Sequence, residues 1–399
     1  MTLSVKIRNF MEQSSWIRKM FEEGARLKLE YGAANVFDLS LGNPVMEPPQ
    51  ELINALKACV EDSSPGMHRY MSNSGFLETR QAIAESLIPE CQVEVGPDNI
   101  LMTCGAAGAL NVTLKTLLDS GDEVIVLAPY FVEYIFYVDN HGGKTRTVPT
   151  DENFLPDLKL IEQAINKNTK AIIVNSPNNP TGVVYPRSVW SELAALLREQ
   201  SAKLHREIYL ISDDPYKKIV YDGVETPNPM EFYTNSIYIT SHSKDLGVPG
   251  ERIGFIALHP EAESAEAIMS GMVFCNRTLG FVNAPALLQR AVTNLQSVKV
   301  DVEQYREKRD FLYRKLIDIG YSVVKPQGAF YLFPRSPIED EVEFCKILAN
   351  YKTLVVPGRG FGLAGYFRIS YCLPDETIRG SVNGFESAFM AVSQRKVGK

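Results

Sequence analysis

One lysine of the chain, Lys244, lies shortly after an apolar run, where polar residues begin. Residues 236–240 read Ser-Ile-Tyr-Ile-Thr, a β-branched pattern typical of a buried strand, and Ser241, Ser243 and Lys244 come next. A lysine held at the carboxyl end of a strand can lose its proton and react as an amine with a carbonyl group. Ser241, Ser243 and Arg252 can hold an anion beside it. Taken alone, this stretch also suits a surface lysine after an edge strand.

Four more apolar runs end in groups that can serve the same ligand. The runs at 99–103, 123–127, 171–175 and 207–212 lead, in that order, to Gly105, to Phe131, to Asn179, and to Asp213 with Tyr216. Helical or loop segments long enough for crossovers separate these runs, so the sequence predicts a mostly parallel sheet. Because open α/β sheets bind ligands beyond the carboxyl ends of their strands, we expect these groups and Lys244 to converge on one edge.

The segment after residues 99–103 has the pattern of an anion-binding helix start. Gly105, Ala106 and Ala107 lead directly into a predicted helix that runs to Leu118. Small residues leave the first backbone N–H groups of a helix accessible, and the helix dipole favours an anion there. The segment matches neither the P-loop nor the dinucleotide-binding pattern, and small residues at a tight turn serve packing equally well.

Three further residues are candidates for ligand contacts. Arg368 lies in the otherwise apolar run 367–371, where a guanidinium needs an anionic partner or a solvated cleft. Its planar fork suits the α-carboxylate of an amino acid, and a structural salt bridge is the equal alternative. Gly42 allows a turn to close over a ligand, and Tyr70 offers a polar contact from a loop. An ordinary turn and a structural tyrosine are the alternatives for these two.

Composition narrows the function classes. With 399 residues, 45% of them apolar and 22% charged, the chain has the composition of a globular protein. A net charge of -7 argues against a nucleic-acid partner, because no basic surplus exists to neutralise phosphates. Six scattered cysteines without a C-x-x-C pair favour free thiols over a metal site or disulfides. With no signal-peptide pattern and no membrane-spanning run, we expect a cytoplasmic protein that does not bind membranes.

The order of the predicted elements indicates an α/β fold with two domains. A large domain, residues 49–289, would hold the mostly parallel sheet flanked by helices, with Pro48 and Pro49 marking its start. A smaller α/β domain would combine both chain ends, residues 1–48 and 290–399. We expect in it one long helix from about residue 290 to 318, with an apolar stripe at Val302, Tyr305, Leu312 and Leu316.

In this combination and order, the motifs resemble the fold type I pyridoxal-phosphate enzymes, specifically the class I/II aminotransferases related to aspartate aminotransferase. The resemblance covers nearly the whole chain, roughly residues 16 to 395. It implies pyridoxal 5′-phosphate as cofactor and a ping-pong transamination between an L-amino acid and a 2-oxo acid. Aspartate, alanine and an aromatic amino acid are the candidate donors. The resemblance also implies a homodimer.

The resemblance implies catalytic roles for residues at the predicted strand ends. Lys244 would carry the cofactor and move the proton at the substrate Cα, and Asp213 would pair with the pyridinium nitrogen. Tyr216 and Asn179 would hydrogen-bond the phenolic oxygen of the cofactor. Phe131 would stack on its ring. The turn Asp-Asp-Pro-Tyr at 213–216 departs from the usual Asp-Glu-x-Tyr, a change that keeps both contacting residues.

The resemblance also implies a phosphate site and a substrate site. The expected phosphate ligands are Ser241, Ser243, Arg252, the backbone N–H groups of Ala106 and Ala107 beside Gly105, and Tyr70 from the neighbouring subunit. Relatives often supply a hydroxyl where this chain has Ala106 and Ala107, so at most a weaker hold on the cofactor is expected. Arg368 would bind the substrate α-carboxylate, with Asn179 and Gly42 nearby.

Side-chain specificity stays open at this level. A dicarboxylate substrate would need a second cation, for which Arg277 and Arg359 are candidates. Phe330, Tyr331 and Phe361 would suit a neutral or aromatic pocket, and all three suit a core equally.

Two other functions remain as alternatives. The same cofactor chemistry supports a lyase or decarboxylase acting on an amino acid. A non-enzymatic ligand-binding or regulatory protein on this scaffold is more remote, because the chain has no basic N-terminal module and keeps both Lys244 and Asp213.

Overall fold

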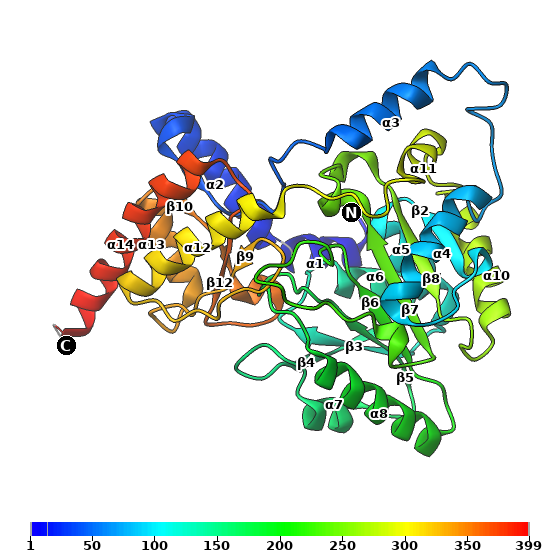
Figure 1. Ribbon diagram of the computed structural model, residues 1–399. Helices are drawn as coiled ribbons and strands as arrows, with labels where there is room; N and C mark the ends of the chain where they lie inside the picture. Colours follow the sequence, from blue (N-terminus) through cyan, green and yellow to red (C-terminus); the bar gives the residue numbers. More distant parts are fainter. Residues whose placement is uncertain (1, 14, 398–399) are drawn as a thin grey trace.

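The computed structural model describes residues 2–13 and 15–397, with side chains placed for 2–11 and 23–394. Two bodies lie side by side (Figure 1). The sheet body consists of a seven-stranded sheet and the helices packed on it. The smaller body contains the helices α2 (Ser15–Tyr31), α12 (Val302–Ile319), α13 (Glu341–Asn350) and α14 (Asp375–Val397) with short strands between them. None of the described helices combines the length and hydropathy needed to cross a bilayer.

The sheet confirms the predicted α/β fold class. Its strands are β2 (Ile100–Thr103), β3 (Glu123–Ala128), β4 (Lys144–Pro149), β5 (Thr169–Val174), β6 (Tyr209–Asp213), β7 (Ser236–Ser241) and β8 (Gly254–Leu258). They lie in the order β2-β8-β7-β6-β5-β3-β4, and β8 is antiparallel to both of its neighbours while all other pairs are parallel. The edge strand β4 was not predicted, because its residues are mostly polar and exposed.

Helices cover both faces of the sheet, which explains the continuous apolar runs of its strands. Along β5, Ile173 packs in the cluster under α5 (Gly105–Leu117), α6 (Tyr134–Asn140) and α10 (Ala265–Thr278), whereas Ile172 and Val174 pack toward α7 (Leu158–Ala164) and α8 (Arg187–Leu204). The second face also carries α3 (Gln50–Glu61), α4 (Leu77–Cys91) and α11 (Ala286–Val292). A strand buried on both faces needs apolar residues at successive positions.

The smaller body joins the two ends of the chain. Strand β1 (Phe37–Asp38) pairs in parallel with β10 (Thr353–Leu354), and β12 (Phe367–Ser370) lies between β11 (Val356–Pro357) and β9 (Tyr331–Leu332). Helix α1 (Val5–Gln13) leaves this body and contacts the sheet body, where Phe10 packs edge-on against Phe136 of α6 with ring centroids 5.0 Å apart.

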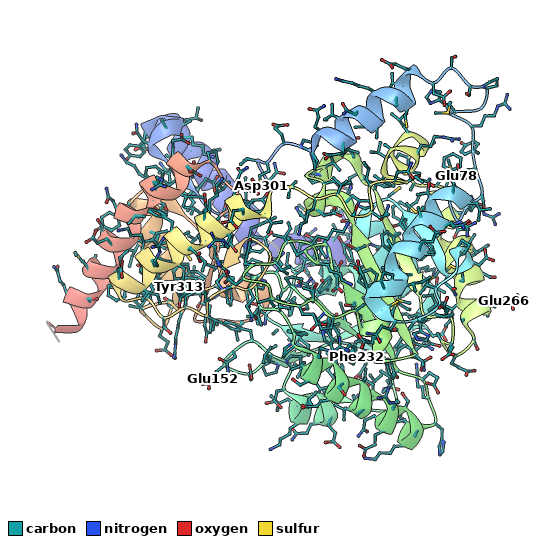
Figure 2. The ribbon with its side chains drawn as sticks, viewed as in Figure 1. Glu78, Glu152, Phe232, Glu266, Asp301 and Tyr313 are labelled. Carbon is teal, nitrogen blue, oxygen red and sulfur yellow. The ribbon has the colours of Figure 1, made fainter. Side chains whose placement is uncertain are left out.

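The single long helix predicted from about 290 to 318 is wrong. The region forms α11 and α12 with residues 293–301 between them, and the side chain of Asp301 accepts the N–H of Glu303 to begin α12. Figure 2 shows Asp301 where the chain crosses from one body to the other. The predicted apolar stripe is confirmed, because Tyr305, Leu312 and Leu316 are fully buried.

Leu312 provides a test of the smaller body's core. Replacing Leu312 by alanine removes a fully buried side chain from the main cluster of this body, and we expect the free energy of unfolding to fall by about 2–5 kcal/mol. Ile317→Ala, on the exposed side of the same helix, should cost less than about 0.5 kcal/mol. Urea unfolding followed by circular dichroism measures both, and equal losses would contradict this assignment of the core.

Candidate active site

A cavity of about 370 Å³ lies beyond the carboxyl ends of the parallel strands, and residues of the smaller body form part of its wall. Twelve of the predicted site residues line it: Gly42, Ala106, Ala107, Phe131, Asn179, Asp213, Tyr216, Ser241, Ser243, Lys244, Arg252 and Arg368. The strand ends therefore converge as the parallel order requires.

Lys244 lies in the single turn α9 (His242–Asp245), immediately after β7. Its Nζ donates a hydrogen bond to the carbonyl oxygen of Gly42 at 3.2 Å and lies 5.6 Å from the centroid of the Phe330 ring. Burial, assisted by the charges of Arg252 and Arg368, lowers the pKa of Lys244 to about 8. A substantial share of this amine is therefore neutral near physiological pH, as a nucleophile or base requires.

Asp213 ends β6 and has one oxygen in use and one free. Its Oδ2 accepts a hydrogen bond of 2.6 Å from the hydroxyl of Tyr134, while Oδ1 is buried with no partner among the described residues. Burial raises the pKa of Asp213 to about 6, against the lowering effect of the Tyr134 hydrogen bond. Above that pH the carboxylate is an anion with an unused acceptor, which suits a cationic N–H donor.

Two asparagines connect Asp213 with the other wall of the cavity. The side-chain amide of Asn175 donates to the backbone carbonyl of Asp213 at 2.6 Å, and its Oδ1 accepts the N–H of Asn179 at 2.7 Å. Elsewhere in the lining, the hydroxyls of Tyr216 and Tyr331 are within hydrogen-bond distance of each other, at 3.0 Å. The loop that carries Asn179 is therefore fixed from beneath.

Arg368 projects from β12 and is held without an acidic partner among the residues that the structure describes. It donates to the side-chain oxygen of Asn179 at 3.1 Å and to the carbonyl of Ser40 at 2.7 Å. Its guanidinium carbon lies 4.7 Å from the ring centroids of both Tyr331 and Phe361. Its buried Nε has no partner in the described part of the chain. A structural salt bridge is thus not what holds Arg368, and its positive charge is available to a carboxylate.

A second set of donors gathers where α5 begins. The hydroxyl of Ser241 donates to that of Ser243 at 3.1 Å, and Arg252 is anchored through the carbonyl of Pro249 at 2.8 Å. Gly105 has a φ of +71°, and a Cβ there would lie 2.7 Å from Nη2 of Arg252. Glycine at this position lets the guanidinium approach the helix N-terminus, which makes an anion cradle.

Some candidates lie elsewhere. Tyr70 is 87% exposed and does not reach the cavity within one chain, and Gly105 lies behind Arg252 rather than in the lining. Arg359 is bound to Glu341 at 2.8 Å, and exposed Arg277 lies over the ring of Phe274. Neither of these two arginines lines the cavity.

Sequence reasoning did not propose several groups of the site and left three aromatic residues undecided. Tyr134, Asn175 and the carbonyl of Ser40 were not proposed as site groups, although Asn175 was visible as the last residue of a predicted strand. Of the three residues left open between pocket and core, Tyr331 and Phe361 line the cavity, whereas Phe330 is buried in the core of the smaller body beside Lys244.

The family model described as aminotransferase class I and II matches residues 34–384. The chain belongs to the aminotransferase class I and II family. The predicted family and enzyme class are therefore confirmed: the protein is a transaminating enzyme, which transfers nitrogenous groups. Membership of the class I and II aminotransferases implies pyridoxal phosphate as the cofactor.

Relatives of this aminotransferase cover nearly its whole length. A probable aspartate aminotransferase of Methanocaldococcus jannaschii is 34% identical over 366 residues, which are 89% of this chain and 94% of the relative. An aspartate/prephenate aminotransferase of Thermus thermophilus is 33% identical over 367 residues, or 90% and 92% of the two chains. A solved amino transferase from Eubacterium rectale, 38% identical, superimposes with a TM-score of 0.95 over 98% of this chain and 99% of its own.

The lowered pKa of Lys244 can be tested on the cofactor-free protein. A group with a lowered pKa loses its proton at a lower pH, so acetylation of Lys244 should reach half its maximal rate near pH 8. In the urea-unfolded chain the same residue should titrate about two pH units higher, near the ordinary value of about 10.4. Competitive labelling with peptide mass spectrometry measures both midpoints. Coinciding midpoints would show that the folded cavity does not perturb this amine.

Proposed function

We propose that this aminotransferase binds pyridoxal 5′-phosphate in the cavity and exchanges the amino group of an L-amino acid with a 2-oxo acid there. The observation that carries the proposal is that Lys244 and Asp213 both line this cavity. Lys244 is an amine of lowered pKa, and Asp213 holds a buried carboxylate oxygen without a partner among the described atoms. An amine to bind a carbonyl and an anion to hold a ring nitrogen are what this cofactor requires.

The chain's residues fit the cofactor at each of its polar groups. The free oxygen of Asp213 would accept the pyridinium N–H, and Tyr216 and Asn179 would serve the phenolic oxygen. Phe131 supplies a ring that would stack on the cofactor. The phosphate would be held by the anion cradle, which consists of Ser241, Ser243, Arg252 and the start of α5 at Gly105, Ala106 and Ala107.

Each residue then has a step to perform. When bound, pyridoxal phosphate supplies a ring that accepts the negative charge developing at the substrate Cα. Arg368 orients the substrate through its α-carboxylate, with the Gly42 backbone close by. Neutral Lys244 Nζ takes the proton from Cα, and Asp213 stays ionised to keep the ring nitrogen protonated. The first product leaves before the second substrate binds, which gives ping-pong kinetics.

We propose further that the enzyme is a cytoplasmic homodimer in which Tyr70 reaches the phosphate site of the partner subunit. The exposure of Tyr70 at 87%, with Val60 at 70% and Leu77 at 55% nearby in sequence, supports a covered surface in this region. Six cysteines held as free thiols support a reducing compartment. We also propose that residues 49–289 form the large domain and that residues 1–48 and 290–399 form the small one.

The proposed activity is tested by a single half-reaction. Purified enzyme loaded with pyridoxal phosphate should release one equivalent of 2-oxo acid per subunit from one L-amino acid, with no acceptor present. Lys244→Ala, which keeps Asp213 and the anion cradle, should slow that release by about 10³-fold or more. Chromatography of the products with the visible spectrum of the cofactor follows the reaction. Repeated turnover without an acceptor would indicate a lyase or decarboxylase instead.

Tyr134→Phe tests how the ring-nitrogen partner is kept ionised. Loss of the hydroxyl removes a donor that lowers the pKa of Asp213, so the pKa should rise from about 6 and the anion should be lost at a higher pH. We expect the affinity for pyridoxal phosphate to fall roughly tenfold near pH 6.5 and to recover above about pH 8. Spectroscopic titration at both pH values measures this. Asp213→Asn, the control, should bind pyridoxal phosphate weakly at both pH values. If Tyr134→Phe also binds weakly at both, the proposed role of the Tyr134 hydroxyl is refuted.

A further inference from the structure

One charged group in the cavity has no role in the chemistry described so far. The charged residues of the lining are Lys244, Arg252, Arg368, Asp213 and Glu133. Lys244 is the reacting amine, and Arg252 is assigned to the phosphate. Arg368 is assigned to the α-carboxylate and Asp213 to the ring nitrogen. Glu133 is left over.

Glu133 is held firmly in the cavity wall. It ends the loop between β3 and α6, where its carbonyl accepts the N–H groups of Phe136 and Tyr137 at 3.1 and 3.0 Å. The same loop is tied to the smaller body, because the N–H of Tyr130 donates to the carbonyl of Phe361 at 3.0 Å. The next residue after Glu133 is Tyr134, the hydrogen-bond donor to Asp213.

The carboxylate of Glu133 is half-buried and makes no hydrogen bond or ion pair with the side chains that the structure describes. Burial alone raises its pKa, and no neighbouring cation opposes that shift. A partly desolvated charge without a partner costs stability, so its presence in a binding cavity points to a function toward the ligand.

Within this chain, the rest of the described lining contributes no further cation for a second carboxylate. Arg277 and Arg359 lie outside the cavity, and Arg359 is neutralised by Glu341. Apart from the groups already assigned, the cavity is lined by the apolar and aromatic residues Leu110, Val132, Tyr331 and Phe361. The side-chain carboxylate of a dicarboxylic amino acid would meet Glu133 without a compensating cation from the described residues of the same chain.

We propose that Glu133 determines substrate specificity by repelling dicarboxylic amino acids, so that the enzyme prefers L-amino acids with uncharged side chains. The proposal rests on the proposed function and sets this chain apart from relatives named for aspartate. Like charges brought together in a partly desolvated site repel strongly, whereas an apolar side chain meets no penalty there.

The variant Glu133→Gln keeps the shape of the side chain and removes its charge. In half-reactions of the wild-type holoenzyme, phenylalanine or alanine should exceed aspartate and glutamate at least about tenfold in kcat/KM. Glu133→Gln should raise kcat/KM for aspartate about tenfold and change that for phenylalanine less than about twofold. Glu152→Gln serves as the control, because Glu152 is exposed, does not line the cavity and lies at the periphery of the molecule in Figure 2. It should change neither value.

A binding measurement separates this inference from the proposed function. Calorimetry with succinate and 3-phenylpropionate, which have no amino group to transfer, reports recognition without chemistry. Wild type should bind 3-phenylpropionate more tightly than succinate. Glu133→Gln should strengthen the binding of succinate and leave that of 3-phenylpropionate nearly unchanged. If no amino acid reacts and these affinities still shift as expected, the proposed function fails while the role of Glu133 stands. Wild-type preference for aspartate and succinate, or equal effects of the variant on both compounds, would overturn the inference.

Discussion

A chain of hydrogen bonds through the floor of the cavity holds the two bodies in register. It runs from the Tyr134 hydroxyl to Asp213, through Asn175 to Asn179, and on to Arg368, which also binds the carbonyl of Ser40. Asp213, Asn175 and Asn179 come from the carboxyl edge of the sheet, Tyr134 begins α6, and Arg368 comes from β12. The groups proposed to hold cofactor and substrate therefore share one rigid frame, and displacing one member changes the position of the next.

Burial in the same cavity also sets the protonation of Lys244 and Asp213. Withdrawal from water destabilises whichever form is charged, so the same environment lowers the pKa of Lys244 and raises that of Asp213. The hydroxyl of Tyr134 limits the second shift and keeps the acid ionised at neutral pH. An amine that is partly neutral and a carboxylate that is still charged thus coexist in one cavity, as acid and base catalysis demands.

The sequence predicted the parts of the site that side-chain chemistry and strand periodicity reveal. Four of the five predicted strand ends line the cavity and Gly105 lies just behind its lining, because parallel order brings carboxyl ends to one edge. No contact had to be known for that prediction. Tyr134 could not be predicted, since it meets Asp213 across 79 positions of sequence. Ser40 acts through its backbone carbonyl, which no residue type signals. The break at 293–301 contains neither proline nor glycine, so the helix prediction ran through it.

The pairing of β1 with β10 has a consequence for how the enzyme is made. The sheet of the larger body draws only on residues between 100 and 258, so its strands are all available well before synthesis ends. Phe37 and Asp38, in contrast, wait for Thr353 and Leu354, and the strand that carries Arg368 emerges later still. During translation the sheet can collapse while the wall opposite Lys244 is missing. The part of the chain made last therefore completes the cavity, because Tyr331, Phe361 and Arg368 all follow the sheet in the sequence.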